Sequence, residues 1–110
     1  MIHELKTLPE FFEAIISGKK KFEIRRADRP FHEGDLLALN EYDSALKCWT
    51  GRSCIVRIDY ILDDKEYCKS GYITMSFTPM QVAPYRYDFV KNPLAGEHGI
   101  PLATFADTND

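Results

Sequence analysis

The hydrophobic period changes from helical to extended within residues 7–26, TLPEFFEAIISGKKKFEIRR. We expect a helix over about 8–17, in which Thr7 and Glu10 form a capping box and Gly18 provides a left-handed C-cap. The apolar residues of the helix recur three and four positions apart and therefore form one stripe: Leu8, Phe11, Phe12, Ile15 and Ile16.

After Gly18, apolar and charged residues alternate, as they do in a strand with one buried face. Phe22 and Ile24 fall on one side of this predicted strand, whereas Glu23 and Arg25 fall on the other. From hydrophobicity we expect the face that carries Phe22 and Ile24 to be the buried one.

Further strands are predicted over 36–41, about 53–62 and 72–77, with a turn at Thr50-Gly51 before the second of them. One early helix and several short strands indicate the α+β class, built as a small mixed β-barrel or a strongly bent sheet.

The last third of the chain differs, because it holds four of the six prolines. We expect a folded domain over residues 1–78 and an irregular C-terminal extension over 79–110. The extension should pack on the barrel, with disorder from about Thr104.

Length and composition indicate one small globular domain. The chain has 110 residues, 45% hydrophobic and 28% charged, and this balance excludes an intrinsically disordered chain. We find no apolar stretch long enough for a membrane span and no signal peptide, and the three cysteines favour reduced thiols. We therefore expect a cytoplasmic protein without membrane contact, and we favour a monomer.

The net charge of −3 argues against indiscriminate binding to nucleic acid. The charge is uneven, however, because residues 19–29 contain six Lys or Arg against two Asp or Glu. An anionic ligand should bind to this basic segment first.

Within the basic segment, cationic side chains surround one carboxylate. Glu23 and Arg25 share a strand face and can pair, and Lys20 can reach the same surface. Such a cluster can bind a phosphate or a polar base, or shift the pKa of a lysine for acid–base chemistry. The alternative, which composition alone favours, is a solvated strand edge whose lysines discourage edge-to-edge pairing.

A metal site and a cofactor are not expected. The three histidines lie far apart, and the three cysteines lack the spacing of zinc ligands. Trp49 and Arg52 fall in a predicted loop, where an exposed ring and an arginine could meet a ligand.

The chain contains, in this order, HELK (3–6), GKKKFEIR (18–25), FHEGDLL (31–37), WTGR (49–52) and GYITMS (71–76). Together these segments resemble the ASCH branch of the PUA-like superfamily. Within that branch they resemble a small bacterial and phage group of unknown function. The resemblance covers residues 2 to about 78.

This resemblance implies a PUA-like β-barrel with a cleft beside the helix-to-strand turn, in a group whose members are proposed to bind RNA or nucleosides. One relative is a bacterial acetylcytidine amidohydrolase. Its pattern has a lysine, a threonine three residues later and a glutamate from a later strand. Lys20 matches the lysine, Glu23 stands at the threonine position, and Glu66 and Thr74 lie near the region of the glutamate.

We therefore predict a module that binds RNA or a modified nucleotide in a polar cleft near the first barrel strand. The alternative is a small amidohydrolase acting on a modified nucleoside such as acetylcytidine, with Lys20 and Glu23 as acid–base groups. A third possibility is a phage accessory protein whose surface binds a host protein. The predicted binding residues are Lys20, Lys21, Glu23, Arg25, Trp49 and Arg52.

Overall fold

The computed structural model describes residues 1–83 and 103–104. The described strands form one mixed sheet in the order β1-β3-β4-β5-β2, with β6 also paired to β5. β1 and β3 run parallel, and the other pairs are antiparallel. The elements are β1 (Ile2–Thr7), α1 (Pro9–Ile16), β2 (Phe22–Arg26), β3 (Leu36–Asp43), β4 (Cys48–Leu62), β5 (Tyr72–Ala83) and β6 (Ala103–Thr104).

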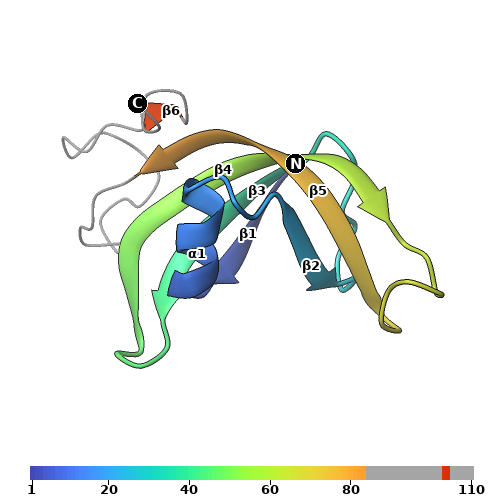
Figure 1. Ribbon diagram of the computed structural model, residues 1–110, viewed down its shortest axis with the longest axis horizontal. Helices are drawn as coiled ribbons and strands as arrows, with labels where there is room; N and C mark the ends of the chain where they lie inside the picture. The colour runs from blue at the N-terminus through green and yellow to red at the C-terminus, as the bar shows by residue number, and fades with distance from the viewer. Residues whose placement is uncertain (84–102, 105–110) are drawn as a thin grey trace.

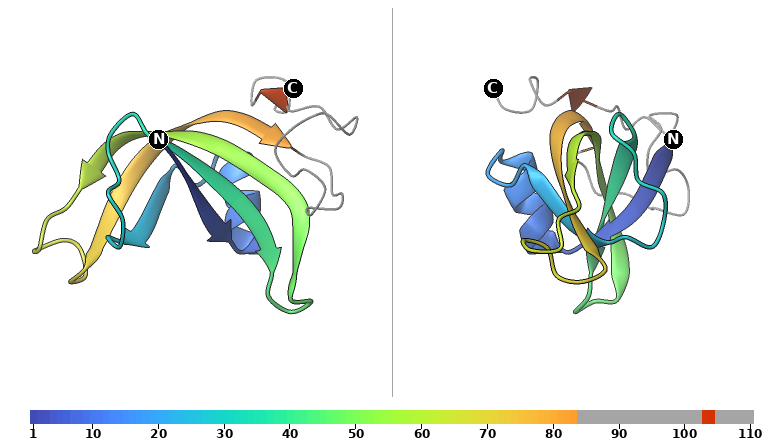
Figure 2. Two further views of the ribbon diagram at one scale, coloured as in Figure 1. Left: turned by 180° about the vertical axis from the view of Figure 1, so that it is seen from behind. Right: turned by 90° about the vertical axis from the view of Figure 1, so that its right-hand side faces the viewer.

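The sheet curls into a half-barrel because its long strands β4 and β5 bend along their length (Figure 1). Figure 2 shows the same arch from behind and from the side, with α1 against it. The register between β4 and β5 shifts at two points, and such bulges increase the bend of a strand. A curled mixed sheet with one short helix is consistent with the small β-barrel class predicted from the sequence.

The core lies between α1 and the sheet. Phe12 and Ile15 are fully buried and belong to one apolar cluster with residues of β3, β4 and β5, among them Leu39 and Met75. Cys54 of β4 lies in the same cluster. Burial, with a smaller contribution from the charge of Glu23, raises the pKa of its thiol to about 12, so this cysteine stays protonated.

The predicted capping box at the start of the helix is wrong. The N-cap is Leu8, which has an extended backbone and provides no side-chain hydrogen bond to the first turn. Thr7 is instead the last residue of β1, so its hydroxyl lies one position too early to cap the helix. Pro9 occupies the first turn, where its missing N–H leaves no donor unsatisfied.

The sequence analysis leaves out one strand and misplaces one turn. No strand is predicted over β1, yet His3, Leu5 and Thr7 are buried in strict alternation along it. The turn expected at Thr50-Gly51 lies inside β4, which starts at Cys48. The chain turns earlier, where the Asp43 carboxylate accepts hydrogen bonds from two successive backbone N–H groups.

The buried face of β2 is the reverse of the predicted one. Glu23 is 4% exposed, whereas Phe22 and Ile24 are 44% and 57% exposed. Glu23 stands opposite buried Met75 of β5 in the register of the sheet and faces the same side. A hydrophobicity pattern cannot detect this arrangement, because it does not show which charged partners accompany a carboxylate into the interior.

Among the described residues, no helix has the length and apolar character required to span a membrane.

β5 continues to Ala83, so the first residues after position 78 remain in the sheet. Most of the predicted C-terminal extension lies outside the described residues.

Candidate functional site

β1 and β2 form the two ends of the sheet order, and side chains of β2 and of the loop after it reach the backbone of β1. Arg25 Nη2 donates to the backbone carbonyl of Lys6 at 2.6 Å, and Arg29 Nη1 donates to that of Glu4 at 3.4 Å. Side chains of β2 and the residues after it therefore bind the backbone of β1. We call this junction the seam.

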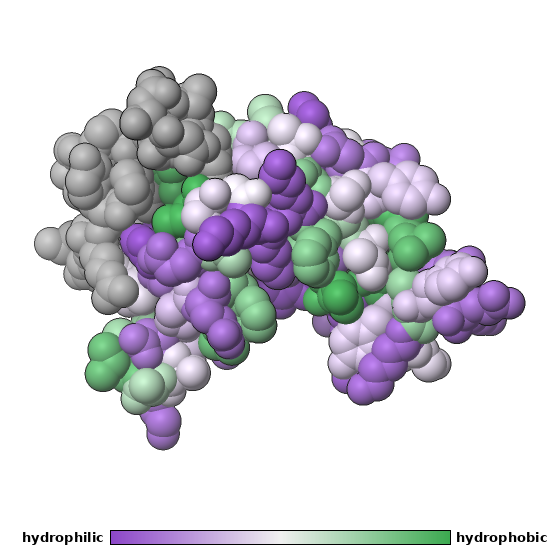
Figure 3. Space-filling view, viewed as in Figure 1, coloured by the Kyte–Doolittle hydropathy of each residue, from purple (hydrophilic) through white to green (hydrophobic). Residues whose placement is uncertain are grey.

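A pocket of about 410 Å³ lies at the seam, and we call it the seam pocket. Its volume falls in the range of ordinary small-molecule sites. Figure 3 shows hydrophilic side chains gathered over the connection between α1 and β2, with hydrophobic residues beside them. The pocket is lined by Lys6, Thr7, Leu8, Phe11, Lys20, Phe22, Glu23, Ile24 and Arg25.

Glu23 is held between two cations in this pocket. Lys20 Nζ lies 2.5 Å from Glu23 Oε1, and Arg25 Nε lies 2.8 Å from Glu23 Oε2. The Glu23 side chain is only 5% exposed, and burying a carboxylate is costly unless charged donors are paired with it. The structure thus brings together Lys20, Glu23 and Arg25, as the sequence predicts.

The seam pocket carries excess positive charge. Lys6, Lys20 and Arg25 are cations, and Glu23 is the one carboxylate among the lining residues. Lys20 uses two of its three N–H donors, on Glu23 and on the carbonyl of Phe22, and Arg25 uses two of its five. The remaining donors can bind an anion or a carbonyl oxygen.

Two aromatic rings border the same cations. Phe11 and Phe22 are each 44% exposed, and Lys20 Nζ lies 5.8 and 5.1 Å from their ring centres. Phe11 belongs to the predicted apolar stripe of the helix, but it faces the pocket rather than the core. An exposed ring next to a cation is a surface on which a flat heterocycle can stack.

Arg52 lies in a different cluster. Its Nε and Nη2 bind Glu41 at 2.8 Å each, and Nη2 also binds Glu13 of α1 at 2.5 Å. These contacts, led by the hydrogen bonds to Glu41, raise the pKa of Arg52 above its already high usual value. Arg52 thus ties β3 and β4 to the helix and does not line the seam pocket.

Trp49 and Lys21 also lie outside the seam pocket. Trp49 packs edge-on against Tyr42, with ring centres 5.0 Å apart, and lines a smaller pocket of about 260 Å³. Lys6 lines both pockets, with its Nζ 4.5 Å from the centre of the Tyr42 ring. Lys21 is exposed, and its backbone carbonyl accepts a hydrogen bond from Phe77.

Sequence reasoning missed the pocket residues that come from β1 and the start of α1. Lys6, Thr7 and Phe11 line the pocket, yet none was predicted to bind a ligand. The sequence carries no strong signal for this strand, because of its buried residues His3, Leu5 and Thr7 only Leu5 is strongly hydrophobic.

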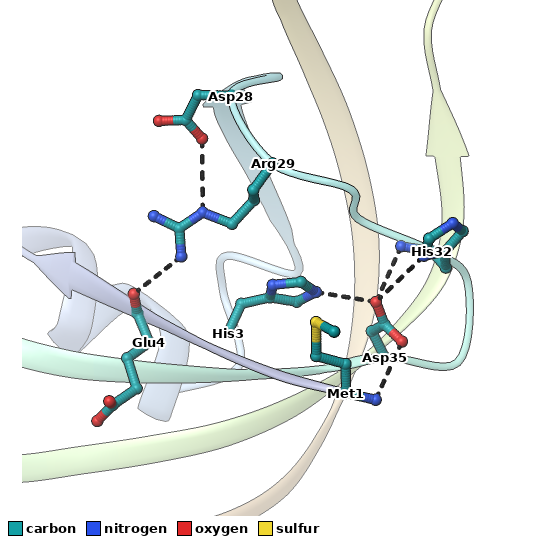
Figure 4. A network of polar contacts seen from close by, with 7 residues as sticks. All are labelled: Met1, His3, Glu4, Asp28, Arg29, His32 and Asp35. Atoms are coloured by element: carbon teal, nitrogen blue, oxygen red, sulfur yellow. Dashed lines mark hydrogen bonds and ion pairs between the residues drawn. The ribbon is translucent and has the colours of Figure 1, made fainter.

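A second polar cluster anchors β1 at its other end. Figure 4 shows His3, His32 and the amino group of Met1 converging on Asp35. His3 Nε2 lies 2.8 Å from Asp35 Oδ2, and the backbone N–H of His32 donates to the same oxygen at 3.0 Å. The hydrogen bond from His3 is the largest of the influences that lower the pKa of Asp35 to about 2. This cluster lies outside both pockets, and its role is to hold β1 beside β3.

One protein family matches residues 2–77, a range that includes the whole seam pocket. Its description is "Domain of unknown function (DUF3850)". The chain belongs to the DUF3850 family. The match also covers α1 and every described strand except the last part of β5 and β6.

This DUF3850 domain is similar to a protein of Escherichia phage P2, described as an "Uncharacterized 12.9 kDa protein in GpA 3'region". The two are 37% identical over 62 residues, which cover 56% of this chain and 55% of the phage protein. The chain therefore spans about half the length of this curated relative.

The fold is similar to that of ZmASCH from Zymomonas mobilis, solved as a crystal structure of a point mutant. The TM-score is 0.51 at 15% sequence identity, over 74% of this chain and 72% of the other. At this identity the likeness shows the fold alone. The ordered segments of the sequence led us to expect an ASCH-like fold, and this likeness of fold agrees with that coarser part of the expectation.

Proposed function

We propose that this DUF3850 domain binds RNA or a modified nucleotide in the seam pocket. The observation that carries the proposal is the buried carboxylate of Glu23, held between Lys20 and Arg25 at a pocket that is open to ligands. This arrangement fixes two cationic donors in place before a ligand arrives, which lowers the entropic cost of binding.

Each part of the pocket suits one part of a nucleotide. The free donors of Lys20 and Arg25 bind phosphate or carbonyl oxygens, while Glu23 orients both cations. Phe11 and Phe22 offer exposed rings to the base. The excess positive charge of the lining favours an anionic nucleotide over a neutral nucleoside.

The ASCH-like fold supports the same proposal, because members of that group are proposed to bind RNA or nucleosides. The phage relative adds no activity, since its description names none.

The contact between Lys20 and Glu23 favours a second candidate function. Nζ and Oε1 lie 2.5 Å apart, so an amine and a carboxylate stand together at the pocket, the two kinds of group that acid–base chemistry on a bound substrate would use. This candidate is a small amidohydrolase acting on a modified nucleoside such as acetylcytidine. Glu23 stands where the resembling enzyme has a threonine, so a hydroxyl nucleophile is absent at that position.

The test is a titration of a labelled single-stranded RNA pool and of the ribonucleoside monophosphates at low salt. Lys20→Ala and Arg25→Ala should each weaken binding by about 1–3 kcal/mol, the range for hydrogen bonds to charged groups. Lys65→Ala and Arg57→Ala are matched controls, because both residues are exposed outside the pocket. Absence of binding by the unmodified protein, or equal losses in the controls, would rule out the proposal.

A further inference from the structure

Thr7 carries a buried polar atom that has no partner. The residue is 3% exposed. Among the residues that the structure describes, its hydroxyl oxygen is the one buried side-chain polar atom without a hydrogen bond. Native proteins rarely leave such an atom unpaired, so an isolated case calls for an explanation.

Another buried threonine of the same sheet shows how the fold ordinarily satisfies this group. Thr50 is 7% exposed, and its hydroxyl donates to the Glu41 carboxylate at 2.5 Å. Thr7 differs from Thr50 in its position, because it lines the seam pocket at the point where β1 ends. Its hydroxyl can both donate and accept a hydrogen bond.

We propose that Thr7 is a ligand-contact residue whose hydroxyl turns into the seam pocket, by rotation about its Cα–Cβ bond, and binds the polar edge of a nucleobase there. This assignment rests on the proposed function. The cations of the lining suit a phosphate, and the exposed rings suit the faces of a base. A ring nitrogen, amino group or carbonyl oxygen at the edge of the base supplies the partner that the protein does not.

The helix α1 makes no use of the Thr7 hydroxyl. Leu8 occupies the N-cap position, and Thr7 lies one residue before it, at the end of β1, with its hydroxyl unpaired. The residue is placed by β1, whose pairing with β3 sets Thr7 opposite Glu41 in the register. Strand pairing thus places Thr7 in the wall of the pocket independently of the helix.

The test is Thr7→Val, which keeps the branched shape of the side chain and removes its hydroxyl. The probes are the four ribonucleoside 5′-monophosphates and ribose 5-phosphate, which has no base. We expect Thr7→Val to weaken the best nucleotide by roughly 3- to 10-fold, the loss of one neutral hydrogen bond. Binding of ribose 5-phosphate should be unchanged, whereas Lys20→Ala should weaken both kinds of probe.

A urea titration without ligand tests the same assignment independently. Because the Thr7 hydroxyl has no protein partner, Thr7→Val should unfold at the same or a higher urea concentration than the unmodified protein. Thr50→Val is the matched control and should unfold at a lower concentration, because it leaves Glu41 with one donor fewer.

The outcomes separate the two proposals. A Thr7→Val variant with unchanged nucleotide affinity, an equal loss for ribose 5-phosphate, or a lowered urea midpoint overturns the assignment of Thr7. If Lys20→Ala still weakens binding in that case, the proposed function stands. An unmodified protein that binds none of the nucleotides overturns the proposed function and the Thr7 assignment together.

Discussion

Glu23 is the residue whose substitution separates the two candidate functions, because a binding site needs the two cations beside it, whereas a general base needs its charge. Glu23→Gln keeps the shape and one acceptor oxygen but removes the charge. We expect RNA affinity to be largely retained, since both cations remain in the pocket. An enzyme that uses Glu23 as a general base would instead lose about 10²–10⁴ in rate.

The measurement for Glu23→Gln is acetylcytidine turnover, followed by chromatography, beside affinity for the RNA pool. Glu10→Gln is the control, because Glu10 is exposed on α1 and does not line the pocket. If the unmodified protein turns over acetylcytidine and Glu23→Gln does not, the binding proposal is wrong and the amidohydrolase candidate takes its place.

Asp35 should make the stability of the fold depend on pH at the acid end. Its pKa is lowered from about 3.8 to about 2, chiefly by the hydrogen bond from His3. The carboxylate therefore contributes stability above about pH 4, and this contribution is lost as the pH falls towards 2. We expect Asp35→Asn to lower the urea midpoint at pH 7 and to flatten its decline between pH 4 and 2. Parallel curves for the two proteins would contradict this role.

At the scale of elements, α1 has two adjacent phenylalanines with different roles. Phe12 is fully buried, whereas Phe11 is 44% exposed and lines the seam pocket. Phe12→Ala should cost about 3–5 kcal/mol of unfolding free energy, the range for a core aromatic. Phe11→Ala should leave stability nearly unchanged and weaken nucleotide binding by about 1–3 kcal/mol, the value of one stacked base.

Urea unfolding and nucleotide titration of both variants check this division. The two substitutions are the same in chemistry and adjacent in sequence, so each serves as the control for the other. Equal shifts in the urea midpoint would show that the two rings are not divided between core and pocket.

The strongly periodic elements could be predicted from the sequence, and the short or polar ones could not. The helix was found because its apolar residues repeat over two turns, and β5 because its residues alternate. β1 has six residues and alternates His3, Leu5 and Thr7 with polar or exposed ones, a pattern too weak in hydrophobicity to identify. Because β1 was not predicted, Lys6 and Thr7 were not recognised as residues of the pocket.

The candidate site could be predicted in part, because its central residues are close in sequence. Lys20, Glu23 and Arg25 lie within six positions, and a strand brings the last two onto one face. The sequence analysis places Arg52 at the cleft because its ion-pair partners cannot be inferred from sequence. These partners, Glu13 and Glu41, are 39 and 11 residues away. Pairings over such separations depend on the fold and leave no local pattern.

For the whole molecule, binding to RNA should weaken with salt only moderately. The chain has a net charge of −3, and three cations line the seam pocket. For about three contacts to the phosphates of single-stranded RNA, log affinity should fall with log salt at a slope of roughly −2. Titrations of the RNA pool at several salt concentrations measure this slope. A much steeper one would place the RNA on a broader surface than the pocket.

Across the seam, Arg25 of β2 and Arg29 of the loop after β2 bind backbone carbonyls of β1, at the place where backbone pairing would close a complete barrel. Releasing the Lys6 carbonyl would cost the Arg25 guanidinium one hydrogen bond and would leave its hydrogen bond to Glu23 intact. The ends of β1 and β2 can therefore separate along the seam without the loss of any hydrogen bond between paired strands. A half-barrel closed by side chains in this way can widen at its open edge while the paired sheet keeps its register.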